Sequence, residues 1–475
     1  MRHKRCAFVD SFQTNKDVMS KNMTLDFVAL LRAWSIEDPA LIRIARLLLL
    51  DGLAVALAGS DQLGPTLAAT LARKQGGHPT ATVIGQGFKT SLSQAAQVNG
   101  MSMHVLDYEP MWNPPNHALS TMLPGLLALA EQQEASGAGP QGERLLHALL
   151  KGIEAQGRLR LSSGQIEPRE LSLHPPGVVG PLAGAIACGD FLALSEAQHV
   201  AAVGIAASRA GGVLANVGSM TKALHCGDAC RSGLEAALLA QSGFTADTDA
   251  LSGPRGYAHA YFGERFDASH LLAPLLVGRV LTPGPAWKLF PSQYATHFAI
   301  TAALDCRAEI AQPEKIKRVE ILTPVMPYID RPNPTSGLDG KFSLQYCVVA
   351  ALLDARLNLD SFSDARRFAD DAKGLLSVTQ LTQTAEISGR FDAMHVDVCV
   401  TLADGTVVRH RCAAPLGSWS RPIAPEVIES KAHDLIDRRL SVQAAEKFWT
   451  AVDAPPQELR ISTLMECLIA DQPLD

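Results

Sequence analysis

The sequence predicts a mostly helical protein: a large all-helical domain formed by both ends of the chain, with a smaller α+β lid domain inserted between them. Three observations carry this prediction. Apolar residues recur at helical spacing through roughly the first 260 residues. The composition then changes at the Thr282-Pro283-Gly284-Pro285 run, and strand-like segments follow it. Helical spacing returns towards the C-terminus. We therefore expect a disordered extension at 1–23, the helical domain at 24–280 and 413–475, and the lid domain at 281–412.

Start and stop signals place the helices of the first domain. Asp38-Pro39 begins a helix that Gly59 ends, because proline is tolerated in the first turn and glycine favours the end. Apolar spacing predicts further helices at 119–136, 141–161, 180–194, 195–208 and 228–242. Small residues in so many helices imply close helix–helix approach.

The lid domain is expected to mix helices and strands. The pattern predicts helices at 292–310 and 341–355, and a strand at 316–323. Two further strands, at 395–402 and 406–412, form a hairpin across Asp404-Gly405, which is a strong turn signal. Helices then return at 426–451.

Composition excludes several classes of protein. Of the 475 residues, 47% are hydrophobic and 19% charged, which excludes disorder for most of the chain. A net charge of -6 and 5% aromatic residues argue against nucleic-acid binding. The most apolar stretch, 41–59, is interrupted by Arg43, Arg46 and Asp51, so a buried helix is favoured over a membrane span.

The cysteines and the N-terminus predict a cytoplasmic protein. The nine cysteines show no framework spacing, so we expect them to be reduced. The N-terminal segment is basic and has no apolar region, so it is not a secretory signal.

Two loop segments carry polar groups that could form a site. The segment 104–117 holds two histidines and two carboxylates among prolines that prevent a helix, which is typical of a site wall, although a polar interdomain loop is the alternative. His174 lies in Leu-His-Pro-Pro-Gly before a small-residue helix, where a helix N-terminus could hold a carboxylate. A structural histidine is the alternative.

Two further segments carry lysines. Lys222 and His225, three residues apart, share a helix face, and a lysine in a region poor in water needs an anion. A surface lysine is the alternative, and zinc at His225, Cys226 and Cys230 is disfavoured because no second ligand pair follows. Lys288 lies at the start of the lid domain, before a helix that Ser292 alone could cap.

The motifs of the common cofactors are missing from the sequence. It has no glycine-rich dinucleotide fingerprint, no phosphate-binding loop, no Gly-x-Ser-x-Gly elbow and no three-cysteine cluster pattern. We therefore expect acid–base chemistry with no cofactor and no metal.

Taken in order, these segments resemble the MmgE/PrpD family over about residues 24–465. The matching pieces include DGLAVALAGS, QAAQVNGMSMHVLDYE, LHPPGVVG, GSMTKALHCGDA, WKLFPSQYATH and KFSLQYCVVAALLD. That family includes 2-methylcitrate dehydratases, cis-aconitate decarboxylases and iminodisuccinate epimerases. The resemblance implies a helical domain with an α+β lid, a homodimer, and a site in the cleft between the domains.

The resemblance also implies site residues and roles. Catalytic positions are Asp107, His117, His174 and Lys222, and substrate-binding positions are His225, Lys288, Gln293 and Met111. Lysines would stabilise charge that develops beside a carboxylate. His117 would be the base, with its tautomer held by Asp107, and Gln293 would bind substrate by hydrogen bonds. Met111 stands where cis-aconitate decarboxylases have threonine, and Gln293 where relatives carry histidine or cysteine.

The expected function is a cofactor-free hydro-lyase, similar to 2-methylcitrate dehydratase, acting on a small di- or tricarboxylic acid. An epimerase or a decarboxylase of a polycarboxylate is the first alternative. A helical dimer that binds a carboxylate without turning it over is the second. Neither nucleic acid nor membrane is expected as a partner.

Overall fold

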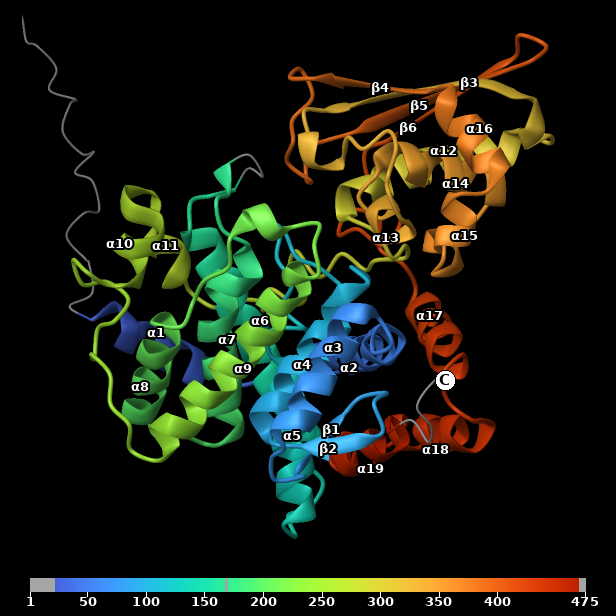
Figure 1. Cartoon of the computed structure of the whole chain (residues 1–475). Coiled ribbons are helices and arrows are strands. Elements are labelled where there is room, and N and C mark those ends of the chain that lie inside the picture. The colour runs from blue at the N-terminus through green and yellow to red at the C-terminus, as the bar shows by residue number, and fades with distance from the viewer. Residues whose placement is uncertain (1–21, 167–169, 470–475) are drawn as a thin grey trace, which may run out of the picture.

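The computed structural model describes residues 22–166 and 170–469 (Figure 1). The expected N-terminal extension therefore lies outside the described residues, except at its last two positions. There Asn22 caps α1 (Met23–Arg32) by accepting a hydrogen bond from the Leu25 amide at 2.9 Å. Met23 is buried in the core, so this residue belongs to the helical domain.

The helical domain is built by both ends of the chain (Figure 1). Its first part comprises α2 (Pro39–Gly59), α3 (Leu63–Gln75), β1 (Ala81–Val83), β2 (Phe88–Thr90), α4 (Leu92–Val105), α5 (Leu123–Ala135), α6 (Gly142–Ser162), α7 (Pro175–Phe191), α8 (Glu196–Ala207), α9 (Thr221–Gln241), α10 (Tyr257–Phe262) and α11 (Ala268–Leu271). Its last part comprises α17 (Pro425–Asp437), α18 (Val442–Val452) and α19 (Ile461–Cys467). Because α17 packs on α2 and α19 packs on α5, residues as distant as Phe27 and Phe448 share one core.

The lid domain has its own core and its own sheet. It comprises α12 (Tyr294–Glu309), β3 (Ile316–Pro324), α13 (Gly337–Gly340), α14 (Leu344–Asp354), α15 (Asp364–Arg367), α16 (Asp370–Ser377), β4 (Thr379–Thr384), β5 (Val396–Leu402) and β6 (Val407–Cys412). The sheet order is β4-β3-β5-β6, with β4 parallel to β3 and the other pairs antiparallel. Helices α12, α14 and α16 pack against the sheet on one side (Figure 1). The predicted fold class is confirmed.

Two helices begin earlier than the sequence predicted. Helix α7 starts at Pro175 instead of 180, because the Pro-Pro-Gly run occupies its first turn, where prolines are tolerated. Helix α9 starts at Thr221 instead of 228. The earlier starts place His174 at the N-cap of α7, and Lys222 and His225 in the first turns of α9.

Glycines let α7 and α9 approach each other closely. A Cβ atom added to Gly233 would lie 2.8 Å from backbone atoms of Pro181 and Gly184. A Cβ atom on Gly177 would lie 2.2 Å from the carbonyl oxygen of Gly211 and 3.5 Å from His225. Close packing therefore brings the N-terminal ends of α7 and α9, with their histidines and lysine, to one place.

Membrane insertion finds no support in the helices. Within residues 22–166 and 170–469, none of the helices combines the length and the apolar character needed to cross a bilayer.

The cysteines that the structure describes are all buried and free: Cys188, Cys226, Cys230, Cys306, Cys347, Cys399, Cys412 and Cys467.

Candidate active site

A cavity of about 250 Å³ lies between loops of the helical domain and the lid. Its wall contains Asp107, Met111, Pro115, Asn116, His117, Leu171, His174, Pro175, Pro176, Leu214, Val217, Lys222, Gln293, Tyr294, Tyr328 and Phe391. The structure thus brings the four expected catalytic residues to one cavity, together with Met111 and Gln293. Lys288 lies behind this wall, where it is fully buried, and His225 lies behind His174.

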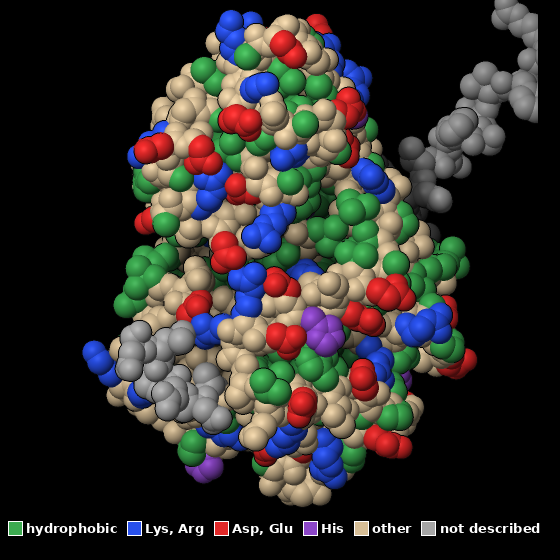
Figure 2. Space-filling view, turned by 90° about the vertical axis from the view of Figure 1, so that its right-hand side faces the viewer, with side chains coloured by type: hydrophobic (Ala, Val, Ile, Leu, Met, Phe, Trp, Pro, Cys, Tyr) green, Lys and Arg blue, Asp and Glu red, His purple; other side chains and the backbone are tan. Residues whose placement is uncertain are grey.

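The larger cavity of the molecule has a different character. It measures about 480 Å³ and lies where the lid meets α17 and the turn after α2. The face that carries α17 is hollowed between its upper and lower parts, with side chains of both signs around the hollow (Figure 2). The arginines of this cavity are paired with its aspartates, Arg438 with Asp360 at 3.2 Å and Arg439 with Asp61 at 2.5 Å. The smaller cavity, which gathers the histidines, is therefore the candidate site.

The Asp107 cluster, which we define as Asp107, Lys222 and Lys288, supplies charge to the site. Each lysine ammonium group bonds one oxygen of the Asp107 carboxylate. Burial alone would raise the pKa of Asp107, but the two ammonium groups outweigh it and hold that pKa well below its usual range. Burial lowers the pKa of Lys288 to about 8, with Asp107 opposing the shift and Lys222 adding to it. The cluster holds one more positive than negative group.

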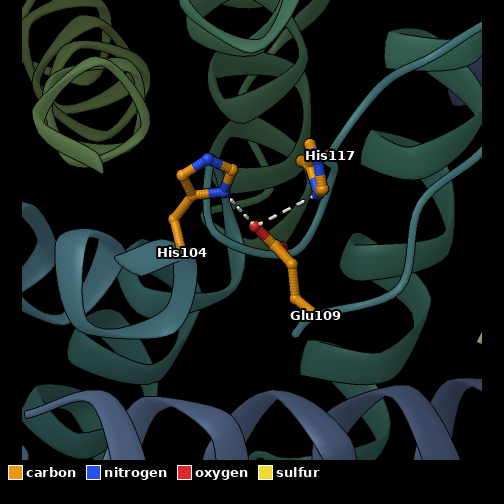
Figure 3. Close-up of side chains that lie close together, drawn as sticks. All are labelled: His104, Glu109 and His117. Atoms are coloured by element: carbon orange, nitrogen blue, oxygen red, sulfur yellow. Dashed lines mark hydrogen bonds and ion pairs between the residues drawn. The ribbon is translucent and has the colours of Figure 1, made fainter. Parts of the chain in front are cut away.

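The Glu109 cluster, which we define as Glu109, His104, His117 and Ser120, joins the end of α4 to the loop that follows it. Figure 3 shows how Glu109 lies between His104 and His117. Glu109 Oε1 accepts hydrogen bonds from the Ser120 hydroxyl at 2.6 Å and from His104 Nδ1 at 2.7 Å. Its Oε2 accepts from the Ser120 amide at 2.9 Å. His117 Nδ1 stands 3.6 Å from Oε1, which is beyond hydrogen-bond length. Burial raises the pKa of Glu109, against the lowering effects of His117 and Ser120.

His117 lies between the two carboxylates as a neutral imidazole. Its Nε2 is 3.9 Å from Asp107 Oδ1, and its Nδ1 faces Glu109. Burial and the neighbouring His104 lower the pKa of His117 to about 3, although both carboxylates oppose the shift. We expected Asp107 to hold the tautomer of His117, but Asp107 is engaged by two lysines, and Glu109 is the nearer carboxylate.

His174 and His225 extend the group of imidazoles. Their Nδ1 atoms are 3.3 Å apart, and His225 is only partly buried. Burial, His104 and Lys222 hold the pKa of His174 well below its usual range, so this ring is also neutral. His225, expected to touch substrate, instead contacts the back of His174.

The lid and the C-terminal part support the site from behind. Gln293 caps α12 by accepting a hydrogen bond from the Ala295 amide at 2.6 Å, so the cap is Gln293 and not Ser292. Lys431 on α17 pairs with Asp51 at 2.8 Å and donates to the carbonyl oxygens of Tyr108 at 2.8 Å and Lys288 at 3.0 Å. These bonds fix the backbone beside both members of the Asp107–Lys288 pair.

Sequence reasoning missed the roles of several buried residues. His104 and Glu109 stand inside the loop segment that pointed to a site, but nothing in their spacing shows that Ser120 joins them. Lys341 is buried at the wall of the larger cavity, and burial, opposed by Asp107, lowers its pKa to about 8. Lys431 reaches the site from more than 300 residues away in sequence, and no local pattern marks it.

His104, Glu109 and His117 are also residues of metal-ligating types. Their potential ligand atoms lie within 4.8 Å of one another. However, His104 Nδ1 and Glu109 are joined by a 2.7 Å hydrogen bond, and Ser120 donates to both carboxylate oxygens. The geometry fits a hydrogen-bonded network better than a ligand set.

The fold and the site together define a class: a helical protein with an α+β lid, and an acid–base site with fixed cations between them. Comparison with known proteins places the chain more narrowly. The family model of the MmgE/PrpD N-terminal domain matches residues 24–269, and that of the MmgE/PrpD C-terminal domain matches residues 290–454. The protein belongs to the MmgE/PrpD family, as the sequence segments predicted.

Similar proteins span nearly the whole chain. Cis-aconitate decarboxylase of Mus musculus is 30% identical over 454 residues, which cover 92% of this chain and 91% of that protein. The Homo sapiens cis-aconitate decarboxylase is 30% identical over 443 residues, covering 90% and 91%. The 2-methylcitrate dehydratase-like protein oryR of Aspergillus oryzae is 24% identical over 482 residues, covering 93% and 94%. The expected enzyme class, a lyase, agrees with these names.

Proposed function

We propose that the protein is a cofactor-free lyase that releases carbon dioxide from a small di- or tricarboxylic acid. The observation that carries this proposal is the combination in one cavity of a neutral imidazole, His117, with the paired ammonium groups of the Asp107 cluster. The similarity to cis-aconitate decarboxylases at 30% identity supports it.

The lysines suit the charge that such a reaction develops. When the carbon–carbon bond breaks, its electron pair stays on carbon and spreads into a neighbouring carboxylate. Fixed cations aimed at that charge lower the barrier without reorganising. Lys222 lines the cavity, and Lys288 holds the other oxygen of Asp107, so the excess positive charge faces the substrate.

The rest of the wall is mainly apolar. Leu171, Leu214, Val217 and Phe391 line the cavity, and Met111 stands beside them. An apolar wall gives a charged carboxylate little solvation and so raises its free energy. Carbon dioxide is neutral and is not destabilised by such a wall, so the wall favours the loss of carbon dioxide. Since Met111 replaces a polar threonine of cis-aconitate decarboxylases, we expect the substrate to carry an apolar substituent there.

Hydro-lyase chemistry, which the sequence analysis placed first, is the second candidate. Elimination of water needs a base for the carbon-bound proton and an acid for the leaving hydroxyl. The cavity offers two imidazoles, His117 and His174, for these tasks. The similarity to a 2-methylcitrate dehydratase-like protein at 24% identity favours this candidate as well.

One experiment separates these reactions. The protein is incubated in deuterated water with citrate, cis-aconitate, 2-methylcitrate and 2-methyl-cis-aconitate, and products are followed by proton NMR while carbon dioxide is measured. Release of carbon dioxide with deuterium in the product supports decarboxylation. Loss of water without carbon dioxide supports the hydro-lyase, and exchange alone supports the epimerase. Thermal stabilisation without any turnover would leave only carboxylate binding.

Matched lysine variants test whether the cavity is responsible. Lys222→Met removes an ammonium group from the wall, whereas Lys74→Met removes an exposed lysine from α3. Activity should disappear only in the first variant. Equal activity in the two variants would rule out the cavity as the active site.

The oligomeric state and compartment belong to the same proposal. A homodimer is implied by the family resemblance, and sedimentation analysis measures it. The free state of the eight described cysteines fits a reducing compartment such as the cytoplasm.

A further inference from the structure

Four imidazoles form a row from the cavity to the edge of the helical domain. The ring centroids of His117 and His104 are 4.7 Å apart, those of His104 and His174 are 5.8 Å apart, and those of His174 and His225 are 5.4 Å apart. His117 and His174 both line the cavity, His104 lies buried between them, and the row ends at His225, which is only partly buried. It joins the loop after α4 to the N-terminal ends of α7 and α9.

Glu109 fixes the proton positions at the inner end of this row. Its carboxylate accepts from the Ser120 amide and hydroxyl, and with Glu109 ionised the 2.7 Å contact with His104 places the proton on His104 Nδ1. His104 Nε2 is then unprotonated, and it is buried without a hydrogen-bond partner. Figure 3 shows this nitrogen turned away from Glu109.

The same reasoning explains the long contact of His117. Glu109 Oε1 already accepts two hydrogen bonds, and His117 Nδ1 at 3.6 Å is buried without a partner. An unprotonated His117 Nδ1 and the Glu109 oxygen are both acceptors, so they do not form a hydrogen bond and stay apart. We therefore place the proton of His117 on Nε2, which faces Asp107. The two orphaned nitrogens, His104 Nε2 and His117 Nδ1, are therefore both sites that can take up a proton.

We propose that His225, His174, His104 and Glu109 carry protons from solvent to His117. This inference rests on the proposed function, because decarboxylation consumes one proton per turnover: the carboxylate leaves as carbon dioxide, and a proton takes its place on carbon. The donor must be resupplied after each such event, and this row connects His117, whose side chain is 13% exposed, with the partly buried His225.

The transfer balances at every step. His225 takes a proton from solvent and gives its Nδ1 proton to His174 Nδ1 at 3.3 Å. His174 passes a proton through one water, across the 5.8 Å ring separation, to His104 Nε2, and His104 then gives its Nδ1 proton to the Glu109 carboxylate. Glu109 passes that proton to His117 Nδ1, and His117 gives its Nε2 proton to the substrate carbon, whose electron pair came from the broken carbon–carbon bond. Each imidazole gains a proton before it loses one, and exchange with water restores the starting tautomers.

The surrounding charges let a proton pass without being trapped. Burial is the largest cause that holds the pKa of His104 well below its usual range. Lys222 and Lys288 lower this pKa further, and Asp107 opposes them. Burial, Lys222 and the other imidazoles likewise lower the pKa of His174. No ring of the inner row therefore holds a second proton for long.

The kinetic test uses His225→Asn, because this residue does not line the cavity. With the acid that the panel above identifies, we expect kcat to fall in dilute buffer by up to about 10²-fold, the lower end of what a positioned acid or base contributes, because His225 acts only through the other imidazoles. Added imidazole should restore kcat in proportion to its concentration, with KM unchanged. His78→Asn, an exposed histidine of the same domain, is the matched control and should show no dependence on buffer. Unchanged kcat in His225→Asn, with no buffer dependence, overturns the proposal.

A second measurement does not depend on turnover. Nitrogen-15 NMR of histidine-labelled protein should show His104 protonated at Nδ1 and His117 at Nε2. In Glu109→Gln the amide group can donate to His104, so the proton of His104 should move to Nε2, and kcat should fall without rescue by imidazole. A His104 protonated at Nε2 in the unaltered protein overturns the path. If the tautomers are as expected but the protein turns over none of the acids, the proposed function fails, and the proton path to His117 fails with it. Turnover with the opposite tautomers overturns the path alone.

Discussion

The Asp107 cluster and the Glu109 cluster show how neighbours decide what a buried carboxylate does. Both residues lie on one loop, two positions apart, and both are buried. Asp107 is bonded by two lysine ammonium groups, and its pKa is lowered. Glu109 is bonded by a serine and an imidazole, and its pKa is raised. The first carboxylate is locked as a charge, whereas the second can take up and release a proton.

The difference follows from what each partner can donate. An ammonium group keeps its charge beside a carboxylate, so the Asp107 cluster is an ion pair with an excess cation. An imidazole has two ring nitrogens, and the hydrogen bond that one of them makes decides whether the other carries a proton. Variants of the two carboxylates should therefore fail in different ways, and the predictions below test this.

The largest effect is expected for Asp107→Asn. Removing one partner of a buried ion pair typically costs about 3–5 kcal/mol, because it leaves an uncompensated charge, and here two ammonium groups lose their partner. We expect a large fall in the free energy of unfolding, measured by urea denaturation, and loss of activity. Glu109→Gln is the matched variant, and its stability should fall much less, because the amide oxygen still accepts from Ser120. Equal destabilisation would remove the distinction between the clusters.

A large effect on activity is expected for His117, His174 and Lys222. Conservative replacement of each should lower kcat/KM by at least about 10²-fold, the lower bound for a general acid or base. The fold should survive, since each change removes a polar tip and little core volume. Steady-state kinetics together with circular dichroism check both parts. A variant that keeps its kcat/KM while folded would exclude that residue from catalysis.

The fold was predictable from the sequence where packing leaves a periodic trace. Helices such as α2, α5 and α6 carry apolar residues at helical spacing between clear start and stop signals, and the predicted ranges fall close to them. Strand β4, with the sequence TQLTQT, was missed because it has almost no apolar alternation, and so was the short β1–β2 hairpin. Strand β4 pairs with β3, and this pairing depends on the surrounding fold and not on the sequence of β4 alone.

The sequence was enough to predict which residues line the site, but not which hydrogen bonds and ion pairs they form. The family resemblance supplied the residues that line the cavity, and the close packing of α7 on α9 explains why they meet. The partners of Asp107 were not predictable, because the choice between His117 and two lysines depends on distances of a few ångströms. Lys431 and Asp51, which fix the backbone beside Asp107 and Lys288, are ordinary residues of amphipathic helices in the sequence.

A smaller effect is expected on the pH dependence of activity. Burial lowers the pKa of Lys288 to about 8, so its ammonium group loses its proton as the pH rises through that value. We expect kcat/KM to fall above about pH 8. In Lys288→Arg the charge persists, because a guanidinium group stays protonated, and the fall should move to higher pH.

Lys341 provides the control for this pH profile. Its pKa is also lowered to about 8, but its ammonium group is 3.4 Å from the Leu106 carbonyl oxygen and is not bonded to Asp107. In Lys341→Met the alkaline fall should remain at the same pH. If the fall disappears in this variant and persists in Lys288→Arg, the charge that matters lies outside the Asp107 cluster.

The smallest effect is expected for Gln293→Ala in the lid. Gln293 uses its carbonyl oxygen to cap α12, its side chain also interacts with the Tyr328 hydroxyl, and an amide is neither an acid nor a base, so the role left for its NH₂ group is hydrogen bonding. Its removal should mainly raise KM, with kcat nearly unchanged, because a uniform binding interaction is lost. Gln293→Ser keeps a side chain that can cap the helix, and it separates the loss of the cap from the loss of the substrate contact. A large fall in kcat at unchanged KM would instead place Gln293 in the proton chemistry, and the lid would then share a task that we assign to the Glu109 cluster.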